Sequence, residues 1–256
     1  MKSKMIKNII ELIKDNRQVY NKLIKIDNDI SRVEINLNKL IEVIDDYKDF
    51  EIKNIPKRKI IVNHYGNPYI TAKLCLEAIC NNTDLIIGIN DLCYSVNKAI
   101  VKTINDVAKD YKIDIKLELM NELVLDGYSN IYKVVCLGDS NTYMDFRKNN
   151  NFRVEYVPLY DINIYYDSYD FEKLANSIVD YAIQNFGEIE VYDESQDFDD
   201  VIQCINDDFE KYCSVILSKD KDKQNRFKNE INSKIICINE NPFRKFKLEV
   251  PSKVWE

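Results

Sequence analysis

The chain has 256 residues, of which 45% are hydrophobic and 31% are charged, and its formal net charge is −7. This balance is typical of a globular chain that can bury a substantial core, and it excludes an intrinsically disordered protein. Because 36 Lys and Arg side chains are spread among 43 Asp and Glu, the sequence predicts no basic face for nucleic acid.

Seven cysteines and a single histidine limit the metal and redox chemistry that the chain can perform. The cysteines are odd in number, form no C-x-x-C pair and mostly stand in apolar runs, so we expect buried, reduced thiols in a cytoplasmic protein. No thiol pair has ligand spacing and His64 is the only histidine, so we expect no zinc site. The amphipathic N-terminus is interrupted by charges every few residues, which predicts neither a signal peptide nor a membrane span.

Residues 1–56 are predicted to form an N-terminal helical segment. Apolar residues recur at helical spacing over residues 3–47, which indicates two or three helices with breaks near Asp27-Asn28-Asp29. We expect these helices to form a layer that supports packing or oligomerisation.

Strands alternate with helices from residue 57 onward, and we assign residues 57–185 to one α/β domain. Short apolar runs predict strands at 59–63, 84–89, 113–119 and 132–137. Between them we expect a helix over 70–81, a helix over 95–111 with Ser95 as its N-cap, and a short helix or turn over 121–127. This alternation predicts a parallel sheet that is covered by helices on both faces.

The same alternation continues in the second half of the chain. Strands are predicted at 152–157, 163–166, 189–192, 214–217 and 234–239, and helices at 171–186, 197–208 and 220–231. We assign residues 186–256 to a smaller second unit, and we expect its tail, 243–256, to form an edge strand or an arm.

The strand predicted over 132–137 ends in the sequence Gly138-Asp139-Ser140-Asn141, and a helix can begin soon afterwards. A strand that leads through small residues into a helix is where α/β proteins hold anions and nucleophiles. The plainer alternative is a tight turn followed by a helix cap.

One resemblance of this stretch is to the GDSL (SGNH) hydrolases. V-V-C-L-G-D-S-N-T-Y resembles their nucleophile block, and L-I-I-G-I-N-D-L at 85–92 resembles their Gly-x-Asn-Asp block, which implies Ser140 as nucleophile. The two blocks stand in reverse order here, however, and no histidine follows His64. Since a serine without a base is a poor nucleophile, the hydrolase is an alternative only.

At full length, residues 57–243 resemble the aldehyde dehydrogenase superfamily, and within it most closely the gamma-glutamyl phosphate reductase (glutamate-5-semialdehyde dehydrogenase) branch. K-R-K-I-I-V-N-H-Y-G-N-P-Y-I-T-A-K-L-C-L-E-A-I-C-N-N-T-D-L-I-I-G is similar to that family's strand, turn, helix and strand, and Y-S-N-I-Y-K-V-V-C-L-G-D-S-N-T to its strand before the cofactor-binding turn. The resemblance implies an α/β fold with a Rossmann-like parallel sheet flanked by helices, an N-terminal helical layer and a reduced second α/β unit.

The resemblance also implies a thiolate nucleophile, an asparagine that holds the oxyanion, and a nicotinamide cofactor. The nucleophile belongs near residues 186–192, yet the chain has no cysteine between Cys136 and Cys204. Residues 186–256 therefore resemble a remnant of the catalytic domain followed by a C-terminal arm. We expect a catalytically inactive relative with a binding, structural or oligomerisation role, acting with a protein partner or as a homo-oligomer.

The resemblance assigns the cofactor side to two turns. Gly138, Asp139 and Ser140 correspond to the cofactor-binding Gly-Ser turn, and Asn67-Pro68, or Asn63, stands where the oxyanion asparagine belongs. Asp139 would place negative charge beside a pyrophosphate, and Ile87 or Gly88 replaces an expected basic residue. We therefore expect no cofactor. NAD or NADP binding, an NAD(P)-dependent oxidoreductase, and altered chemistry around Gly138–Ser140 are the alternatives.

Overall fold

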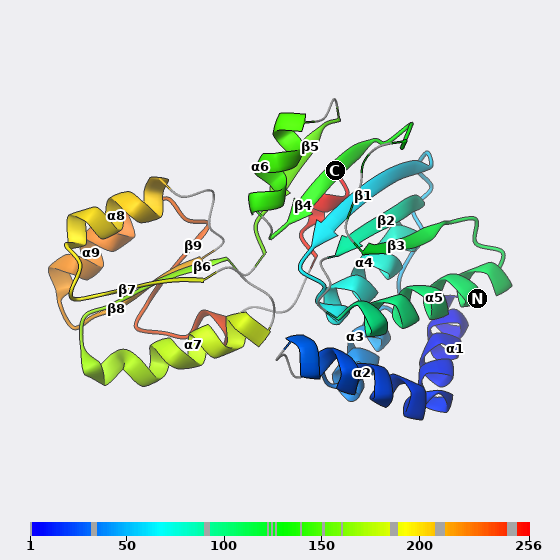
Figure 1. The fold of residues 1–256 in the computed structure, drawn as a ribbon, viewed down its shortest axis with the longest axis horizontal. Coiled ribbons are helices and arrows are strands. Elements are labelled where there is room, and N and C mark those ends of the chain that lie inside the picture. Colours follow the sequence, from blue (N-terminus) through cyan, green and yellow to red (C-terminus); the bar gives the residue numbers. More distant parts are fainter. Residues whose placement is uncertain are drawn as a thin grey trace. The chain divides into compact units, whose positions relative to one another are not determined.

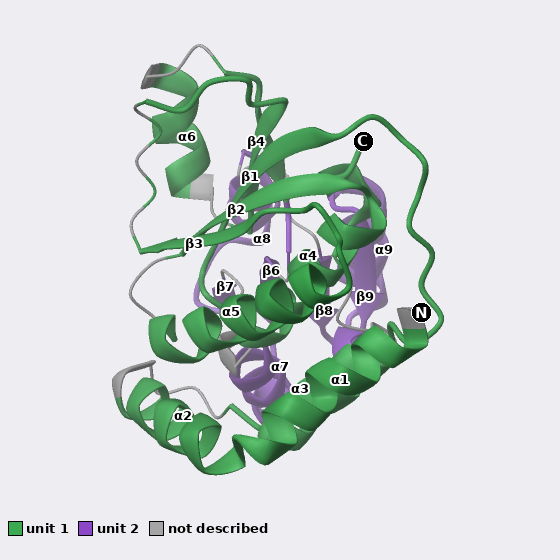
Figure 2. Ribbon diagram, turned by 90° about the vertical axis from the view of Figure 1, so that its right-hand side faces the viewer, with its two compact units in different colours: residues 1–157, 249–256 green, residues 158–248 purple. Residues whose placement is uncertain are grey.

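The computed structural model of the chain describes residues 2–31, 35–89, 93–121, 123, 125, 127–138, 140–149, 152–159, 161–184, 189–207, 213–244 and 250–256. The chain forms two compact units: unit 1 comprises residues 1–157 and 249–256, and unit 2 comprises residues 158–248 (Figure 2). Whereas the sequence suggested a boundary at residue 185, the units divide after Val157. The predicted strand and helix at 163–186 therefore belong to unit 2.

Unit 1 is built around a sheet of five parallel strands in the order β3-β2-β1-β4-β5 (Figure 1). Its strands are β1 (Arg58–His64), β2 (Thr83–Ile89), β3 (Leu117–Asn121), β4 (Lys133–Leu137) and β5 (Val154–Val157). The central strands are continuous apolar runs because they are buried on both faces, as the sequence indicated. The third strand begins four residues later than predicted.

Helices cover both faces of this sheet. Helices α4 (Pro68–Cys80) and α5 (Tyr94–Asp110) pack on one face, and α1 (Lys2–Asp15), α2 (Arg17–Ser31) and α3 (Leu37–Asp45) form a further layer beyond them (Figure 1). The opposite face carries α6 (Ser140–Asn149), whose Phe146 packs with Ile61 and Val134. The predicted N-terminal helical layer is therefore confirmed.

Two local predictions about the helices of unit 1 are wrong. Helix α2 runs without a break through Asp27, which is buried and accepts a hydrogen bond from the backbone amide of Val96 at 2.7 Å. Ser95 does not cap the helix predicted over 95–111, because α5 already begins at Tyr94 and no side chain of Cys93, the preceding residue, caps it. Asp27, which was predicted to end one helix, thus accepts a hydrogen bond from a backbone N–H in the first turn of another helix.

The segment predicted as a short helix or turn at 121–127 is only partly described. Asn121 is the last residue of β3, Gly127 lies in a turn with φ 85°, and residues 122, 124 and 126 lie outside the described part of the chain. Leu123 and Leu125 pack on the face of the sheet that α6 also covers.

Unit 2 repeats the plan with four parallel strands in the order β7-β6-β8-β9. Its strands are β6 (Ile162–Tyr166), β7 (Ile189–Asp193), β8 (Cys213–Leu217) and β9 (Ile235–Ile238). Helix α7 (Glu172–Gln184) packs on one face, while α8 (Phe198–Asp207) and α9 (Lys221–Glu230) pack on the other. The expected reduced second α/β unit is confirmed.

The end of the chain returns to unit 1. Residues 250–256 contain a 3-10 turn, Ser252–Val254, and no edge strand. The indole nitrogen of Trp255 donates to Glu77 Oε2 at 2.5 Å, and Lys133 Nζ donates to the Lys253 carbonyl at 2.7 Å. Of the predicted tail, 243–256, residues 250–256 therefore pack on unit 1, Phe243 packs in unit 2, and residues 245–249 lie outside the described residues. Among the described helices, none is long and apolar enough to cross a membrane.

Candidate functional site

The sequence-predicted turns of unit 1 meet at one edge of its sheet. Strands β1 and β4 are neighbours, with His64 opposite Leu137, and the chain continues to β2 on one side and to β5 on the other. This is the topological switch point of a doubly wound sheet, where ligands of such folds bind. Asn67-Pro68 follows β1 and Gly138 follows β4, so the structure brings these predicted residues to the same edge.

The turn after β1 uses its own polar groups to begin a helix. Asn67 is buried, and its Oδ1 accepts from the amides of Tyr69 at 2.9 Å and Ile70 at 3.3 Å. Pro68 has no N–H, and the Thr71 amide donates to the Asn67 carbonyl. Since an anion at a helix N-terminus needs free amides, the first turn of α4 offers none.

The turn after β4 is tied to the edge strand. Gly138 is buried, has φ 72°, and donates its amide to the Val157 carbonyl at 2.9 Å. A positive φ of this size favours glycine, which explains the residue type. Ser140 is the first residue of α6; its side chain and the whole of Asp139 lie outside the described residues.

His64, the only candidate base, is committed to the turn that follows its strand. Its Nδ1 accepts from the Gly66 amide at 3.1 Å, so Nε2 carries the proton and donates to Thr71 Oγ1 at 3.2 Å. Complete burial lowers the pKa of His64 to about 3, which keeps the ring neutral. Both nitrogens are therefore engaged, and neither is available as the base that a Ser140 nucleophile needs.

Gly88 explains why no basic side chain stands at the end of β2. A Cβ on Gly88 would lie 2.7 Å from Leu123 Cβ and 2.8 Å from Asn63 Oδ1. The chain's own side chains therefore fill the position that the resemblance assigns to a cofactor-binding residue.

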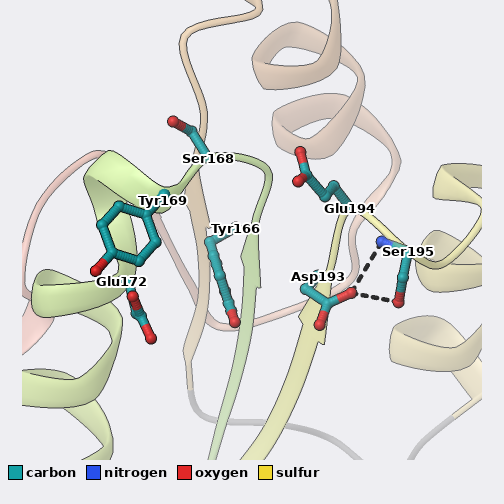
Figure 3. A pocket seen from close by; sticks show the side chains of 7 residues that line it. All are labelled: Tyr166, Ser168, Tyr169, Glu172, Asp193, Glu194 and Ser195. Atoms are coloured by element: carbon teal, nitrogen blue, oxygen red, sulfur yellow. Dashed lines mark hydrogen bonds between the residues drawn. The ribbon is translucent and has the colours of Figure 1, made fainter.

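Unit 2 has a pocket of about 290 Å³ at the carboxyl ends of β6 and β7 (Figure 3). One wall follows β6 and the other follows β7, and the lining consists of Tyr166, Ser168, Tyr169, Glu172, Asp193, Glu194 and Ser195. Three of the lining side chains are carboxylates and none of them is a cation. The pocket therefore suits a cationic or hydroxyl-rich group rather than a phosphate. The side-chain and backbone hydrogen bonds from Ser195 lower the pKa of Asp193.

Sequence reasoning missed this pocket because no motif marks it. The available signal was weak: both strands end in polar, acidic stretches, Tyr166–Asp170 and Asp193–Ser195.

A cluster of hydrogen bonds lies next to this pocket, at the switch point between β6 and β8. Ser218 Oγ donates to Asp167 at 2.5 Å, and Lys223 Nζ donates to Tyr165 Oη at 2.8 Å. These groups satisfy one another and fix α9 to the sheet.

Comparison with known proteins gives likeness in structure only. No protein-family model and no curated protein matches the chain. The gamma-glutamyl phosphate reductase of Thermotoga maritima matches with a TM-score of 0.58 and 14% identity, over 94% of this chain and 83% of that chain. Glyceraldehyde-3-phosphate dehydrogenase GapN of Methanocaldococcus jannaschii, complexed with NADP, matches with a TM-score of 0.59 and 12% identity, over 96% and 82%.

The chain has an aldehyde dehydrogenase-like fold. A betaine aldehyde dehydrogenase of Staphylococcus aureus in complex with NAD+ also matches the chain in structure, with a TM-score of 0.56 and 13% identity over 94% of this chain and 77% of that chain. The predicted fold class is confirmed, including its likeness to gamma-glutamyl phosphate reductase, and at these identities the likeness concerns the fold.

The sequence resemblance implied a thiolate nucleophile, so the surroundings of this chain's thiols bear on that expectation. Five are buried: Cys75, Cys93, Cys136, Cys213 and Cys237. Burial raises the pKa of Cys75, and the hydrogen bond with Cys237 together with burial raises that of Cys213. Cys80 is partly buried, and Cys204, on α8, is exposed. The buried thiols are suited to packing rather than to nucleophilic attack.

The described residues fit a nicotinamide cofactor poorly. The first turn of α4 has no free amide, and Leu123 with Asn63 fills the space beyond Gly88. The strand order and the Gly138 turn are the features that match a dinucleotide site. The cofactor roles of Gly138, Asp139, Ser140, Asn67 and Pro68 stay predictions.

Proposed function

We propose that this protein is a binding protein of aldehyde dehydrogenase-like fold that carries out no dehydrogenase or reductase turnover. The observation that carries the proposal is the missing nucleophile. No cysteine stands between Cys136 and Cys204, and neither of these two lies where the family's thiolate belongs. Without a thiolate no thiohemiacetal or thioester forms, so there is nothing from which a hydride could pass to the cofactor.

A turnover assay tests this proposal. Purified protein is mixed with NAD+ or NADP+ and a panel of aldehydes, and with the reduced cofactors and an acyl phosphate, while nicotinamide absorbance is followed. We expect rates equal to those without protein. Turnover that Cys204→Ser abolishes would contradict the proposal, because Cys204 is the exposed thiol of the described residues. Cys80→Ser is the matched control.

A second candidate is NAD(P) binding without turnover. The strand order β3-β2-β1-β4-β5 favours it, since dinucleotides bind at this switch point in doubly wound sheets. Calorimetric titration with NADH and NADPH in the same preparation decides between the two: absence of saturable binding eliminates this candidate. Saturable binding that Ser140→Ala or Asn67→Ala weakens would favour it.

Self-association through the N-terminal helices is also part of the proposal. Leu12 of α1 and Val19 and Ile26 of α2 are 41%, 54% and 50% exposed, and Val19 and Ile26, seven residues apart, share one face of their helix. We expect light scattering to give more than one chain per particle, and the double variant Val19→Ser/Ile26→Ser to give one. A monomeric wild-type protein would remove this part of the proposal.

A further inference from the structure

The pocket of unit 2 has its principal side chains on one face of the sheet. Tyr166 and Asp193 are opposite residues of the paired strands β6 and β7, so their side chains leave the sheet on the same side. Tyr166 packs against the apolar cluster that α7 forms with this face, and Glu172 is the first residue of α7. Tyr166 accordingly lies between Glu172 and Asp193 in the pocket of about 290 Å³ (Figure 3).

The carboxylates of this pocket have free oxygen atoms on both walls. Glu172 is partly buried, and its carboxylate has no hydrogen bond and no ion pair within the described part of the chain. Asp193 accepts from the Ser195 amide at 2.8 Å and from the Ser195 hydroxyl, and both bonds end at Oδ1, which leaves Oδ2 free. Each wall therefore presents a carboxylate oxygen that can accept a hydrogen bond from a ligand.

The cations near this pocket do not neutralise it. Lys219 forms an ion pair with Asp170. Lys173 is exposed and lines a neighbouring hollow. Because adjacent residues of a helix point in different directions, Lys173 does not cover the Glu172 carboxylate. The lining of the pocket therefore carries uncompensated negative charge.

The aromatic rings of the pocket are open to a cation as well. A lysine lies over the ring of Tyr165, on the other face of the sheet, but no cation of the described residues lies over Tyr166 or Tyr169. Tyr169 is 86% exposed. Since the face of a tyrosine ring attracts cations and also packs against methylene groups, the pocket offers an aliphatic cation two kinds of contact.

We propose that this pocket binds a linear aliphatic diamine or polyamine. One ammonium group donates to Glu172 and another to Asp193 Oδ2 on the opposite wall, and the methylene chain between them lies along the Tyr166 ring. An extended dication fits better than a metal ion, because no three carboxylate, thiol or imidazole groups of the described residues are placed to hold one metal. The site lies within unit 2 and does not depend on the proposed function.

Calorimetric titration at low ionic strength tests this proposal with four probes: putrescine, butylamine, the uncharged butanediol of the same length, and Mg²⁺. We expect saturable binding of putrescine, and binding of butylamine that is weaker by about tenfold or more, because one charge-assisted hydrogen bond is lost. Butanediol and Mg²⁺ show no saturation over the same range.

Variants on both walls locate the site. Glu172→Gln and Asp193→Asn, which keep the size of the side chain, each weaken putrescine binding about tenfold. Asp180→Asn is the matched control: it removes an exposed carboxylate of the same helix, roughly 12 Å along the axis from Glu172, and leaves the affinity unchanged.

Several outcomes would overturn the proposal. One is the absence of saturable putrescine binding to the wild-type protein. Equal putrescine affinity of the wild type, Glu172→Gln and Asp193→Asn would place the diamine elsewhere on this acidic chain. Butylamine or butanediol binding as tight as that of putrescine would remove the need for a charge at each end. Saturable Mg²⁺ binding that Glu172→Gln abolishes would make the pocket a metal site instead.

Discussion

The imidazole of His64 lies at the carboxyl end of the central strand, where a catalytic base would be useful, yet it serves the local structure. It accepts from the Gly66 amide and donates to Thr71, and it is neutral because burial removes the hydration of the charged form. Protonation would break the bond from Gly66 and leave a buried charge. The native state is therefore incompatible with the imidazolium ion.

This makes the stability of the protein depend on pH through His64. Its pKa is about 3 in the folded state and near 6.5 in the unfolded state, so between these values only the unfolded chain takes up the proton. The contribution of His64 to the free energy of unfolding is therefore fully present above about pH 6.5, and it is lost as the pH decreases toward 3. We expect the free energy of unfolding of the wild type, relative to that of His64→Gln, to fall by about 2 kcal/mol between about pH 8 and about pH 5.

Urea unfolding followed by circular dichroism measures this difference at each pH. The carboxylates titrate in both proteins, so subtracting the variant removes their contribution. Parallel stability curves for wild type and variant would show that His64 is accessible to protons in the folded state, contrary to the geometry.

Gly88 shows what the sequence could and could not predict about the site. The missing basic residue was visible, because its place in the apolar strand holds Ile87 or Gly88. Its physical cause was not visible, since Leu123 stands 35 positions away and meets Gly88 only in the folded chain. In the same way, Asn67-Pro68 suggested either a turn or an oxyanion holder, and only the bonds from Tyr69 and Ile70 identify the helix cap.

Among the helices and strands, the apolar pattern of the sequence predicts those elements whose bounds depend on residues close together in the chain. The buried strands β1, β2 and β4 are continuous apolar runs, and their bounds were predicted to within about one residue. Strand β3 begins later than predicted, because Ile113 still donates to the Ala108 carbonyl at the end of α5, and pairing with β2 includes no residue before Leu117. The start of α5 was predicted to within one residue, but its cap was not, because the capping carboxylate belongs to Asp27, 69 positions from Val96.

The Asp27 carboxylate therefore gives a test of how the helical layer is joined to the sheet domain. It accepts from the Val96 amide in the first turn of α5, where negative charge is also favoured by the helix dipole. We expect Asp27→Ala to lower the free energy of unfolding by about 2 kcal/mol. Chemical denaturation measures the loss.

Asp29 provides the matched control, since it lies on the same helix and is exposed. Asp29→Ala changes stability by no more than about 0.5 kcal/mol. Equal losses for the two variants would indicate that Asp27 acts through the net charge of α2 rather than as a cap.

At the scale of the whole molecule, both units follow one topological plan. The first strand of each sheet, β1 or β6, is central, the next strand pairs on one side, and the chain then crosses to the other. The sequence shows no internal repeat, so the alternation of strands and helices predicted both sheets but not this correspondence. The division after Val157 also escaped prediction, because contacts between distant residues define it and residues 250–256 return to unit 1.

That return predicts how the two units share stability. Trp255 is 7% exposed, its indole donates to Glu77, and its carbonyl accepts from Arg58. Because both partners belong to unit 1, these contacts stabilise that unit. Trp255→Ala should cost unit 1 about 3 kcal/mol. Amide hydrogen exchange measured by mass spectrometry should then accelerate by about a hundredfold in peptides of β1 and β4, and stay unchanged in peptides of β6 and β8.

The exchange experiment has its control in unit 2. Tyr169 is 86% exposed, and Tyr169→Ala should change exchange in neither sheet. If Trp255→Ala accelerated exchange in β6 and β8 as strongly as in β1 and β4, the two units would unfold as one cooperative body. Acceleration confined to unit 1 would mean that each sheet, with the helices packed on it, opens independently, as expected for two units that each bury their own core.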